Sequence, residues 1–293
     1  MESPPSITSI CNTNGVKAIL SSRGASLLEL HFPDASGEQM NVVDSRPSHR
    51  FAGVTIGRVA NRIRDGAFDL DGEHFELTRN EGNHHLHGGS QEPLDELLWN
   101  AENTPSSVHF HVQSPHGTGG YPGTLDVQAS FLLTEDNALV MEYSATTDQP
   151  TPVNLTNHAY WNLGGPIQEH ELTIGAQRYA PTDKELIPTG SLDRVAGTAL
   201  DFTQPRPLGA APIDHTFDLD NGSPAAVLKS SQSSRCMEVR TTQAALQLFT
   251  TEHALCLEAQ GFPDAVHQTN FPSVILRPGE VYFQTTIHRF WNE

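Results

Sequence analysis

The sequence of 293 residues predicts an all-β fold, a large antiparallel sandwich or barrel. Apolar residues alternate with polar residues at a period of two along many short segments, as they do in half-buried strands. Turn-forming residues recur between these segments, and the chain holds 23 Gly and 20 Pro. Many short strands with frequent turns are typical of sandwiches and barrels. A helical turn or two is expected only at Pro93–Trp99 (PLDELLW).

Two hairpins are the clearest of the predicted elements. Residues 125–133 and 139–145 alternate on either side of the turn formed by residues 134–137. A shorter hairpin over residues 68–77 turns at Asp71-Gly72, a pair that suits a type I′ turn because Gly tolerates positive φ. Further strands are expected at 16–32, 107–113, 153–162, 170–175, 236–241, 245–251, 254–260 and 281–290.

The Pro-rich stretch 176–224 has few periodic runs. We expect it to form an ordered excursion, because it contains apolar residues such as Leu200 and Phe202 that a disordered segment would lack. A linker between two halves of the chain is the alternative.

Composition excludes several classes of partner. With 17 Lys+Arg against 35 Asp+Glu, the formal net charge is −18. Nucleic acids and anionic membranes attract basic surfaces, so neither is an expected partner. No apolar run approaches the roughly 20 residues that span a bilayer. The N-terminus resembles no signal peptide and the three cysteines form no CxxC pair, so we expect a cytoplasmic protein with reduced thiols.

Histidines and hydrogen-bonding side chains gather in two segments. The first, Asn83–Gly89 (NHHLHGG), is open to three interpretations: metal ligands, structural histidines, or groups that bind a polar ligand. The metal interpretation is the least favoured, because no carboxylate or Cys stands at an established ligand spacing. The second segment, 153–162, has one polar face as a strand, either solvated or lining a cleft for a polyhydroxy ligand. That face would hold Asn154, Thr156, His158, Tyr160 and Asn162.

Three further residues are candidates for acid–base or ligand chemistry. Glu258 stands between Leu257 and Ala259, so it either faces solvent or is a carboxylate whose pKa is raised by partial burial. A raised pKa would suit a general base near neutral pH. Gln247 lies between two leucines, and Asp214 precedes a histidine in a Pro-rich loop; each is a weak signal by itself.

Seven segments, taken in order, resemble the aldose 1-epimerases, also called galactose mutarotases. No single motif is decisive, but the order of all seven is, and the resemblance covers roughly residues 12–293. The segments are Gly57–Ile63 (GRVANRI), Leu86–Gly89 (LHGG), Gly120–Gly123 (GYPG), Asn154–Tyr160 (NLTNHAY), Ile213–His215 (IDH), Cys256–Glu258 with Pro263–Val266 (CLE, PDAV), and Phe271–Pro272 with Leu276–Glu280 (FP, LRPGE).

The resemblance implies a β-supersandwich that forms a single domain over residues 1–293, without a metal or an organic cofactor. It implies that Glu258 is the general base and His158 the general acid, with Tyr160 close by. It also implies ligands to sugar hydroxyls at Asn61, Arg62, His87, Asp214 and Gln247. The expected partner is a small-molecule aldose, and the expected state is a monomer or a weak homodimer.

This chemistry suits the interconversion of α and β anomers. A base removes the proton of the C1 hydroxyl while an acid protonates the ring oxygen, and the open aldehyde rotates about C1–C2 before the ring closes again. A glutamate of raised pKa and a histidine that can be cationic suit these two steps near pH 7. The leading hypothesis is therefore an epimerase of free hexoses such as galactose and glucose.

Other hypotheses are kept beside it. A hexose 6-phosphate or another aldose is one alternative substrate, and a phosphate would need extra cations such as Arg46, Arg50 and Arg58. A silent sugar-binding protein would be expected to have lost Glu258 or His158. The third alternative is a lyase or hydrolase built on a related sandwich. Hydrolysis would require a pair of carboxylates that flank the bond. Departures from the family pattern, such as Ala259 and the short segment after Gln247, bear on substrate preference.

Overall fold

The computed structural model describes residues 4–46, 51–220 and 224–293. Within those ranges the chain forms β-sheets, with no α-helix and three single-turn 3₁₀ segments, and every named strand pair is antiparallel. The 3₁₀ segments are η1 (Arg64–Gly66), η2 (Thr118–Gly120) and η3 (Ile167–Glu169). The predicted all-β, antiparallel fold class is confirmed.

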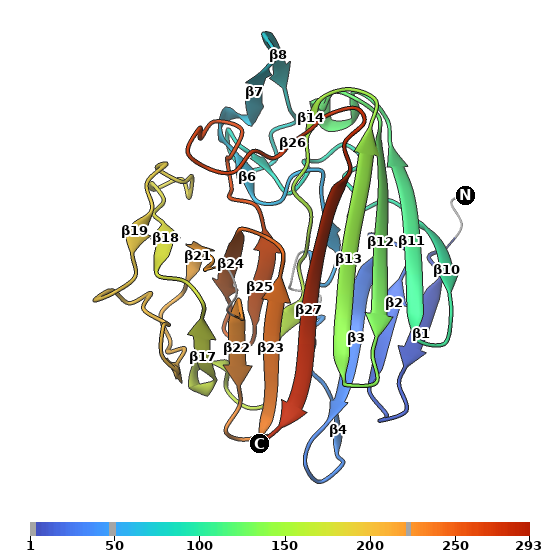
Figure 1. Cartoon of the computed structure of the whole chain (residues 1–293), viewed down its shortest axis with the longest axis vertical. Coiled ribbons are helices and arrows are strands. Elements are labelled where there is room, and N and C mark those ends of the chain that lie inside the picture. The colour runs from blue at the N-terminus through green and yellow to red at the C-terminus, as the bar shows by residue number, and fades with distance from the viewer. Residues whose placement is uncertain (1–3, 47–50, 221–223) are drawn as a thin grey trace.

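The largest sheet has nine strands and runs through the middle of the molecule (Figure 1). It contains the predicted long hairpin, in which residues 125–133 pair with residues 139–147. In spatial order the strands are β10 (Asn100–Asn103), β11 (Ser107–Ser114), β12 (Leu125–Leu133), β13 (Ala138–Thr147), β27 (Tyr282–Asn292), β23 (Arg235–Thr241), β22 (Ala226–Lys229), β17 (Glu171–Ile174) and β20 (Arg206–Pro207).

Two smaller sheets pack against the nine-stranded sheet. The first is β1 (Ile7–Cys11), β2 (Lys17–Ser21), β3 (Ser26–Pro33) and β4 (Gln39–Asn41). The second is β16 (Tyr160–Trp161), β25 (Leu255–Gln260), β24 (Ala245–Thr250), β21 (Asp214–Asp218), β18 (Arg178–Ala180) and β19 (Asp193–Arg194). One hydrophobic core joins all three sheets, with Leu30, Phe131, Phe290, Leu248 and Leu257 among its buried members.

Four short strand pairs connect the layers and shape the loops. They are β5 (Thr55–Ile56) with β15 (Thr156–Asn157), β6 (Arg62–Ile63) with β9 (His85–Leu86), β7 (Ala67–Leu70) with β8 (Glu73–Glu76), and β14 (Thr151–Pro152) with β26 (Ile275–Leu276). In the β7–β8 hairpin, which projects at one end of the molecule in Figure 1, Asp71 and Gly72 have φ of 53° and 87°. Positive φ at both positions is what a type I′ turn requires.

No helix forms at Pro93–Trp99, where the predicted helical turn or two is reduced to one hydrogen-bonded turn. Residues 94–96 form a hydrogen-bonded turn, and the chain then extends so that Leu98 bridges to Arg23. The indole of buried Trp99 donates to the carbonyl oxygen of Leu94 at 3.0 Å. Tertiary pairing with the first sheet therefore overrides the weak local helical pattern.

Two predicted strands are interrupted. Residues 16–32 contain a reversal at residues 22–25 that separates β2 from β3, where Gly24 and Ala25 have positive φ. Residues 153–162 form no continuous strand, because they pair first with β5 and then with β25. The stretch 176–224 is ordered wherever it is described, and it supplies β18, β19, β20 and β21, as the excursion interpretation predicts.

No helix among the described residues is long and apolar enough to cross a membrane.

Gly88 holds the loop that follows β9 against the loop before β6. Its φ is 84°, and a Cβ built there would lie 1.9 Å from the carbonyl oxygen of Gly57. Gly72 has a similar φ of 87°, but a Cβ there would meet no atom within 4 Å. A side chain at either position would strain the backbone, but only at Gly88 would it also overlap another atom. Comparing the two positions therefore separates the two effects.

We predict that Gly88→Ala destabilises the protein far more than Gly72→Ala. The Gly72→Ala variant should lose about 1 kcal/mol of unfolding free energy from the left-handed backbone alone. The Gly88→Ala variant should lose at least ~3 kcal/mol, because backbone must move to admit the methyl group. Urea unfolding of both variants measures the difference, and equal losses would contradict the close approach.

Candidate active site

Glu258 lies in the middle of β25, between the neighbouring strands β24 and β16. The antiparallel register sets Gln247 of β24 directly opposite Glu258. Alternation along β25 directs Leu257 into the hydrophobic core, so Glu258 and Cys256 face the other side. That side is closed as well, since Glu258 is only 2% exposed. The strand pairing thus delivers a carboxylate to a buried position.

His158 faces this carboxylate from the segment between β15 and β16. Its Nε2 lies 3.7 Å from Oε1 of Glu258. Its ring stacks on Tyr160, with 5.0 Å between the ring centroids, and Phe51 approaches its ring to 5.9 Å. Because aromatic rings flank it, the imidazole is held with one nitrogen toward the carboxylate.

Burial raises the pKa of Glu258 well above its usual value. The nearby negative charge of Asp214 raises it further, and the positive charge of Arg62 opposes the shift. The second carboxylate oxygen, Oε2, is buried and accepts no hydrogen bond from any described residue. A buried acceptor without a donor is costly, so the site is built for a ligand that brings a hydroxyl group to this oxygen.

Asp214 and Gln247 form one wall of the site. Asp214 begins β21, and β21 pairs with β24 so that Thr216 stands opposite Gln247. The amide group of Gln247 donates to Asp214 Oδ1 and accepts from the hydroxyl of Thr216. Burial raises the pKa of Asp214, while the charge of Arg62 opposes this. The chain of hydrogen bonds fixes the orientation of the Gln247 amide.

Asn61, Arg62 and His87 come from the two loops joined by β6 and β9. The backbone amide of Asn61 donates to His87 Nδ1 at 3.2 Å, and both residues adopt a left-handed backbone. Arg62 binds Glu81 through two hydrogen bonds, of 2.6 Å from Nε and 2.9 Å from Nη2. The ring of His87 lies 5.4 Å from that of His158. This ring contact places the wall beside His158, which faces Glu258.

The structure therefore gathers all eight residues singled out in the sequence around one site. It adds four to which the sequence analysis gave no role at the site: Phe51, Glu81, Thr216 and Cys256. Cys256 could have been found by alternation, because it stands two residues before Glu258 on the same face. Phe51, Glu81 and Thr216 carry no such signal, since only the folded loops and strand pairing bring them to the site.

The histidine cluster separates into different roles. His85 is fully buried and is held by the carbonyl oxygen of Thr78 at 2.6 Å and the Tyr121 hydroxyl at 2.7 Å. Burial lowers its pKa to about 4, so it stays neutral. His84 Nδ1 accepts from the backbone amide of Asp65. Two of the three histidines are thus structural, and only His87 lies at the site. Across the described part of the chain, the donor set that clusters closely enough for a metal ion is His158, Cys256 and Glu258.

Comparison with known proteins identifies the family of the chain. Residues 6–289 match the family model described as aldose 1-epimerase. The chain belongs to the aldose 1-epimerase family. It is 40% identical to the galactose mutarotase of Homo sapiens over 82% of this chain and 79% of that protein. It is 32% identical to the aldose 1-epimerase of Haemophilus influenzae over 98% and 96%.

Solved structures agree at the level of the whole fold. A homologue of the aldose epimerases from C. elegans superposes with a TM-score of 0.94 at 29% identity, covering 99% of both chains. A galactose 1-epimerase from Lactobacillus acidophilus superposes with a TM-score of 0.88 at 27% identity, covering 100% of this chain and 97% of that one. The chain is therefore an epimerase with a galactose mutarotase-like sandwich, and so an isomerase.

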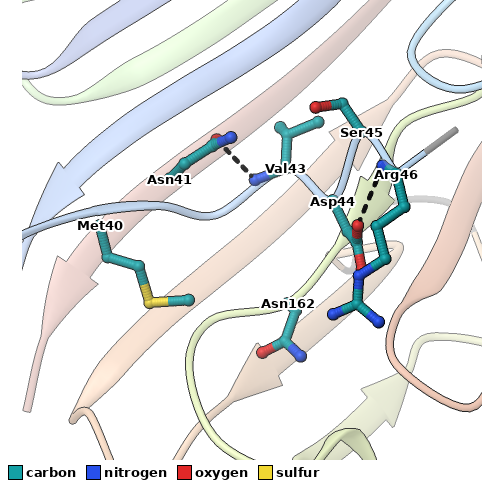
Figure 2. A pocket seen from close by; sticks show the side chains of 7 residues that line it. All are labelled: Met40, Asn41, Val43, Asp44, Ser45, Arg46 and Asn162. Carbon is teal, nitrogen blue, oxygen red and sulfur yellow. Dashed lines mark hydrogen bonds and ion pairs between the residues drawn. The ribbon is translucent and has the colours of Figure 1, made fainter.

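A cavity of about 410 Å³ lies beside the end of the segment 153–162 (Figure 2). It is lined by Met40, Asn41, Val43, Asp44, Ser45, Arg46 and Asn162. Asn162 follows Tyr160 by two residues, and the backbone amide of Asp44 donates to the carbonyl oxygen of Tyr160 at 2.7 Å. Figure 2 shows Arg46 folded onto Asp44, an ion pair of 3.1 Å.

Two of the three cations named for a phosphorylated substrate, Arg46 and Arg58, are engaged elsewhere in this epimerase. Arg58 is buried, and its guanidinium donates to carbonyl oxygens of Ser114, Pro115, Pro122 and Gly123 at 2.8–2.9 Å. Arg46 pairs with Asp44, and Arg50 lies outside the described residues. Arg58 is thus a structural cation that satisfies a turn, and it offers nothing to a phosphate.

We predict that Glu81→Ala weakens sugar binding more than it slows the chemical step. Loss of the two-pronged contact frees Arg62 to rotate, so KM should rise about tenfold with a smaller change in kcat. Glu76→Ala, an exposed change on neighbouring β8, is the control and should leave both constants unchanged. Steady-state polarimetry measures them, and an unchanged KM for Glu81→Ala would show that Glu81 does not position Arg62.

Proposed function

We propose that this protein is a mutarotase that interconverts the α and β anomers of free hexoses such as galactose and glucose. The observation that carries the proposal is the buried pair of Glu258 and His158. Their facing atoms are 3.7 Å apart, and no described residue donates a hydrogen bond to the other carboxylate oxygen. The assignment of the family supports the same reaction.

In the proposed mechanism, Glu258 takes the proton of the C1 hydroxyl. His158 gives a proton to the ring oxygen, so the C1–O5 bond breaks and the hemiacetal opens to the aldehyde. After rotation about C1–C2, the C5 hydroxyl attacks the other face of C1. His158 takes back the proton of that hydroxyl, and Glu258 gives its proton to the oxygen on C1. Each proton transfer of this kind contributes about 10²–10⁴-fold to the rate.

The raised pKa of Glu258 is what makes it a useful base. A carboxylate with an ordinary pKa is too weak to accept a hydroxyl proton near neutral pH, whereas one whose charged form is disfavoured by burial is stronger. The negative charge of Asp214 increases this shift in pKa, and the positive charge of Arg62 opposes it. The environment therefore tunes the base between two opposing charges.

The remaining polar residues are proposed to hold the sugar. Arg62 is a planar cation that can donate to two adjacent hydroxyls, and Glu81 fixes its orientation. On the opposite wall, Asp214 would accept hydrogen bonds from hydroxyl groups of the sugar. Gln247 lies beside it and donates to its carboxylate. The other residues proposed to contact the sugar are Asn61, His87 and Tyr160. A hexose presents many hydroxyls, which suits walls of this kind.

A free sugar is favoured over a sugar phosphate. Arg46 and Arg58 are engaged by Asp44 and by backbone carbonyls, and the net charge of −18 gives a phosphate no general attraction. Retention of both Glu258 and His158 favours an enzyme over a silent sugar-binding protein.

We also propose that residues 1–293 form a single domain, that the protein is a monomer or weak homodimer, and that it acts in the cytoplasm without nucleic-acid or membrane partners. The continuous core that joins the three large sheets supports the first proposal. Light scattering at micromolar concentration should give a mass near 32 kDa. A stable tetramer would contradict the proposed oligomeric state.

We predict that Glu258→Gln abolishes nearly all mutarotation of α-D-galactose and α-D-glucose. The amide cannot accept the C1 proton, so kcat should fall at least 10³-fold. The folded state binds a proton on Glu258 more tightly than the unfolded chain does, so ionisation of Glu258 destabilises the fold as the pH rises. The neutral variant should therefore be at least as heat-stable as the wild type at pH 8.

Polarimetry and thermal unfolding of the same preparation decide this prediction. Retention of more than a tenth of kcat, a loss below about 1.4 kcal/mol, would remove Glu258 from the role of base. Loss of activity together with a lower Tm would instead indicate a structural role for the carboxylate. Glu252→Gln, an exposed change in the preceding turn, is the matched control.

We predict that Asp214→Asn moves the acid limb of the pH profile to lower pH. In the wild type, kcat/KM should fall with decreasing pH at a value above the usual range of a glutamate, because the base must be ionised and its pKa is raised. Removing the Asp214 charge lowers that pKa, while the lost hydroxyl contact lowers kcat/KM. Asp218→Asn, on the same strand and paired with Arg178, should leave the limb in place. An acid limb that stays fixed in Asp214→Asn would contradict the coupling.

A further inference from the structure

Cys256 is a buried thiol at the site that the proposed reaction does not use. It lies on β25 two residues before Glu258, and its strand partners are Tyr160 on β16 and Phe249 on β24. Its side chain is fully buried, and its Sγ lies 3.5 Å from Nδ1 of His158. A sulfur atom therefore contacts one nitrogen of the imidazole whose other nitrogen faces the carboxylate.

These three side chains form a compact set of metal donors. One donor atom from each of His158, Cys256 and Glu258 lies within 4.8 Å of the others. Around a tetrahedral zinc ion with bonds of ~2.0–2.3 Å, ligand atoms stand about 3.3–3.8 Å apart. Side-chain movements of about 1 Å would therefore complete the geometry around either imidazole nitrogen.

The orphaned oxygen of Glu258 is a second, independent observation. Glu258 Oε2 is buried without a donor among the described residues, so it presents a lone pair into the site. The combination of one imidazole, one thiol and one carboxylate matches zinc, and three protein ligands leave a fourth position for water or a sugar hydroxyl. Hard cations such as Mg²⁺ prefer oxygen ligands alone.

We propose that His158, Cys256 and Glu258 form an inhibitory site for thiophilic divalent cations, represented by Zn²⁺. Binding releases the thiol proton to solvent and joins the thiolate, the imidazole and the carboxylate to the ion. The cation then occupies the two groups that move protons, so it excludes the sugar and stops ring opening. Only the activity readout rests on the proposed mutarotase function; the binding itself does not.

Cobalt substitution tests the site directly. Adding Co²⁺ to the wild-type protein should produce a thiolate-to-cobalt charge-transfer band at one equivalent, and Zn²⁺ should remove it. Co²⁺ bound to surface histidines, such as His109 and His111 on β11, would give no such band. Excess galactose should weaken cobalt binding, because sugar and cation share Glu258 and His158.

Inhibition of mutarotation gives the second readout. Zn²⁺ should inhibit the wild type and Mg²⁺ should not. Cys256→Ser should lose the charge-transfer band and need at least ~10-fold more Zn²⁺ for half-inhibition relative to its own metal-free rate, because the softest ligand is gone. Cys11→Ser and Cys236→Ser remove the other two thiols and should behave as the wild type does.

Two results would overturn the proposal: no charge-transfer band in folded wild-type protein, or equal sensitivity to Zn²⁺ in Cys256→Ser. If Cys256→Ser does not fold, Glu258→Gln takes its place, and it must bind Co²⁺ more weakly than the wild type. A wild-type protein that shows the band but has no mutarotase activity would keep the metal site and refute the proposed function instead.

Discussion

The burial of a carboxylate on β25, between the neighbouring strands β24 and β16, is the constraint on which the site depends. Antiparallel pairing sets Gln247 opposite Glu258, and Leu257 commits the other face of β25 to the core. A one-residue slip of β25 would exchange these faces and turn the carboxylate into the hydrophobic core. The hydrophobic core thus enforces the register that places the base, and the same burial raises its pKa.

Glu258 is buried next to charges that offset one another. Arg62 lowers the pKa of Glu258 and Asp214 raises it, while Glu81 holds Arg62 and Gln247 holds Asp214. Each of these partners is supplied by a different loop or strand, so the electrostatics of the base depend on how the layers pack. His158, Cys256 and the aromatic rings form the remaining wall, in which the thiol explains why the same arrangement suits a soft cation.

Sequence patterns predicted the strands and turns that are determined by neighbouring residues along the chain. Period-two alternation predicted β12, β13, β24 and β25, and Asp71-Gly72 predicted a turn that needs two positive φ angles. Alternation also shows that Cys256 and Glu258 share a face, but it cannot show whether that face is buried. The pattern at residues 153–162 predicts one strand, whereas these residues pair with different sheets in turn. The contact of Glu81 with Arg62 has no local pattern, because it exists only once two loops have folded.

The central claim is that burial makes Glu258 a base by raising its pKa, and titration of that one carboxyl group tests it most directly. The difference between ¹³C-glutamate spectra of the wild type and Glu258→Gln isolates its signal. The account predicts that Glu258 ionises well above the usual glutamate range, at the same pH as the acid limb of kcat/KM. Ionisation near the ordinary value of 4.5, or away from that limb, would contradict it.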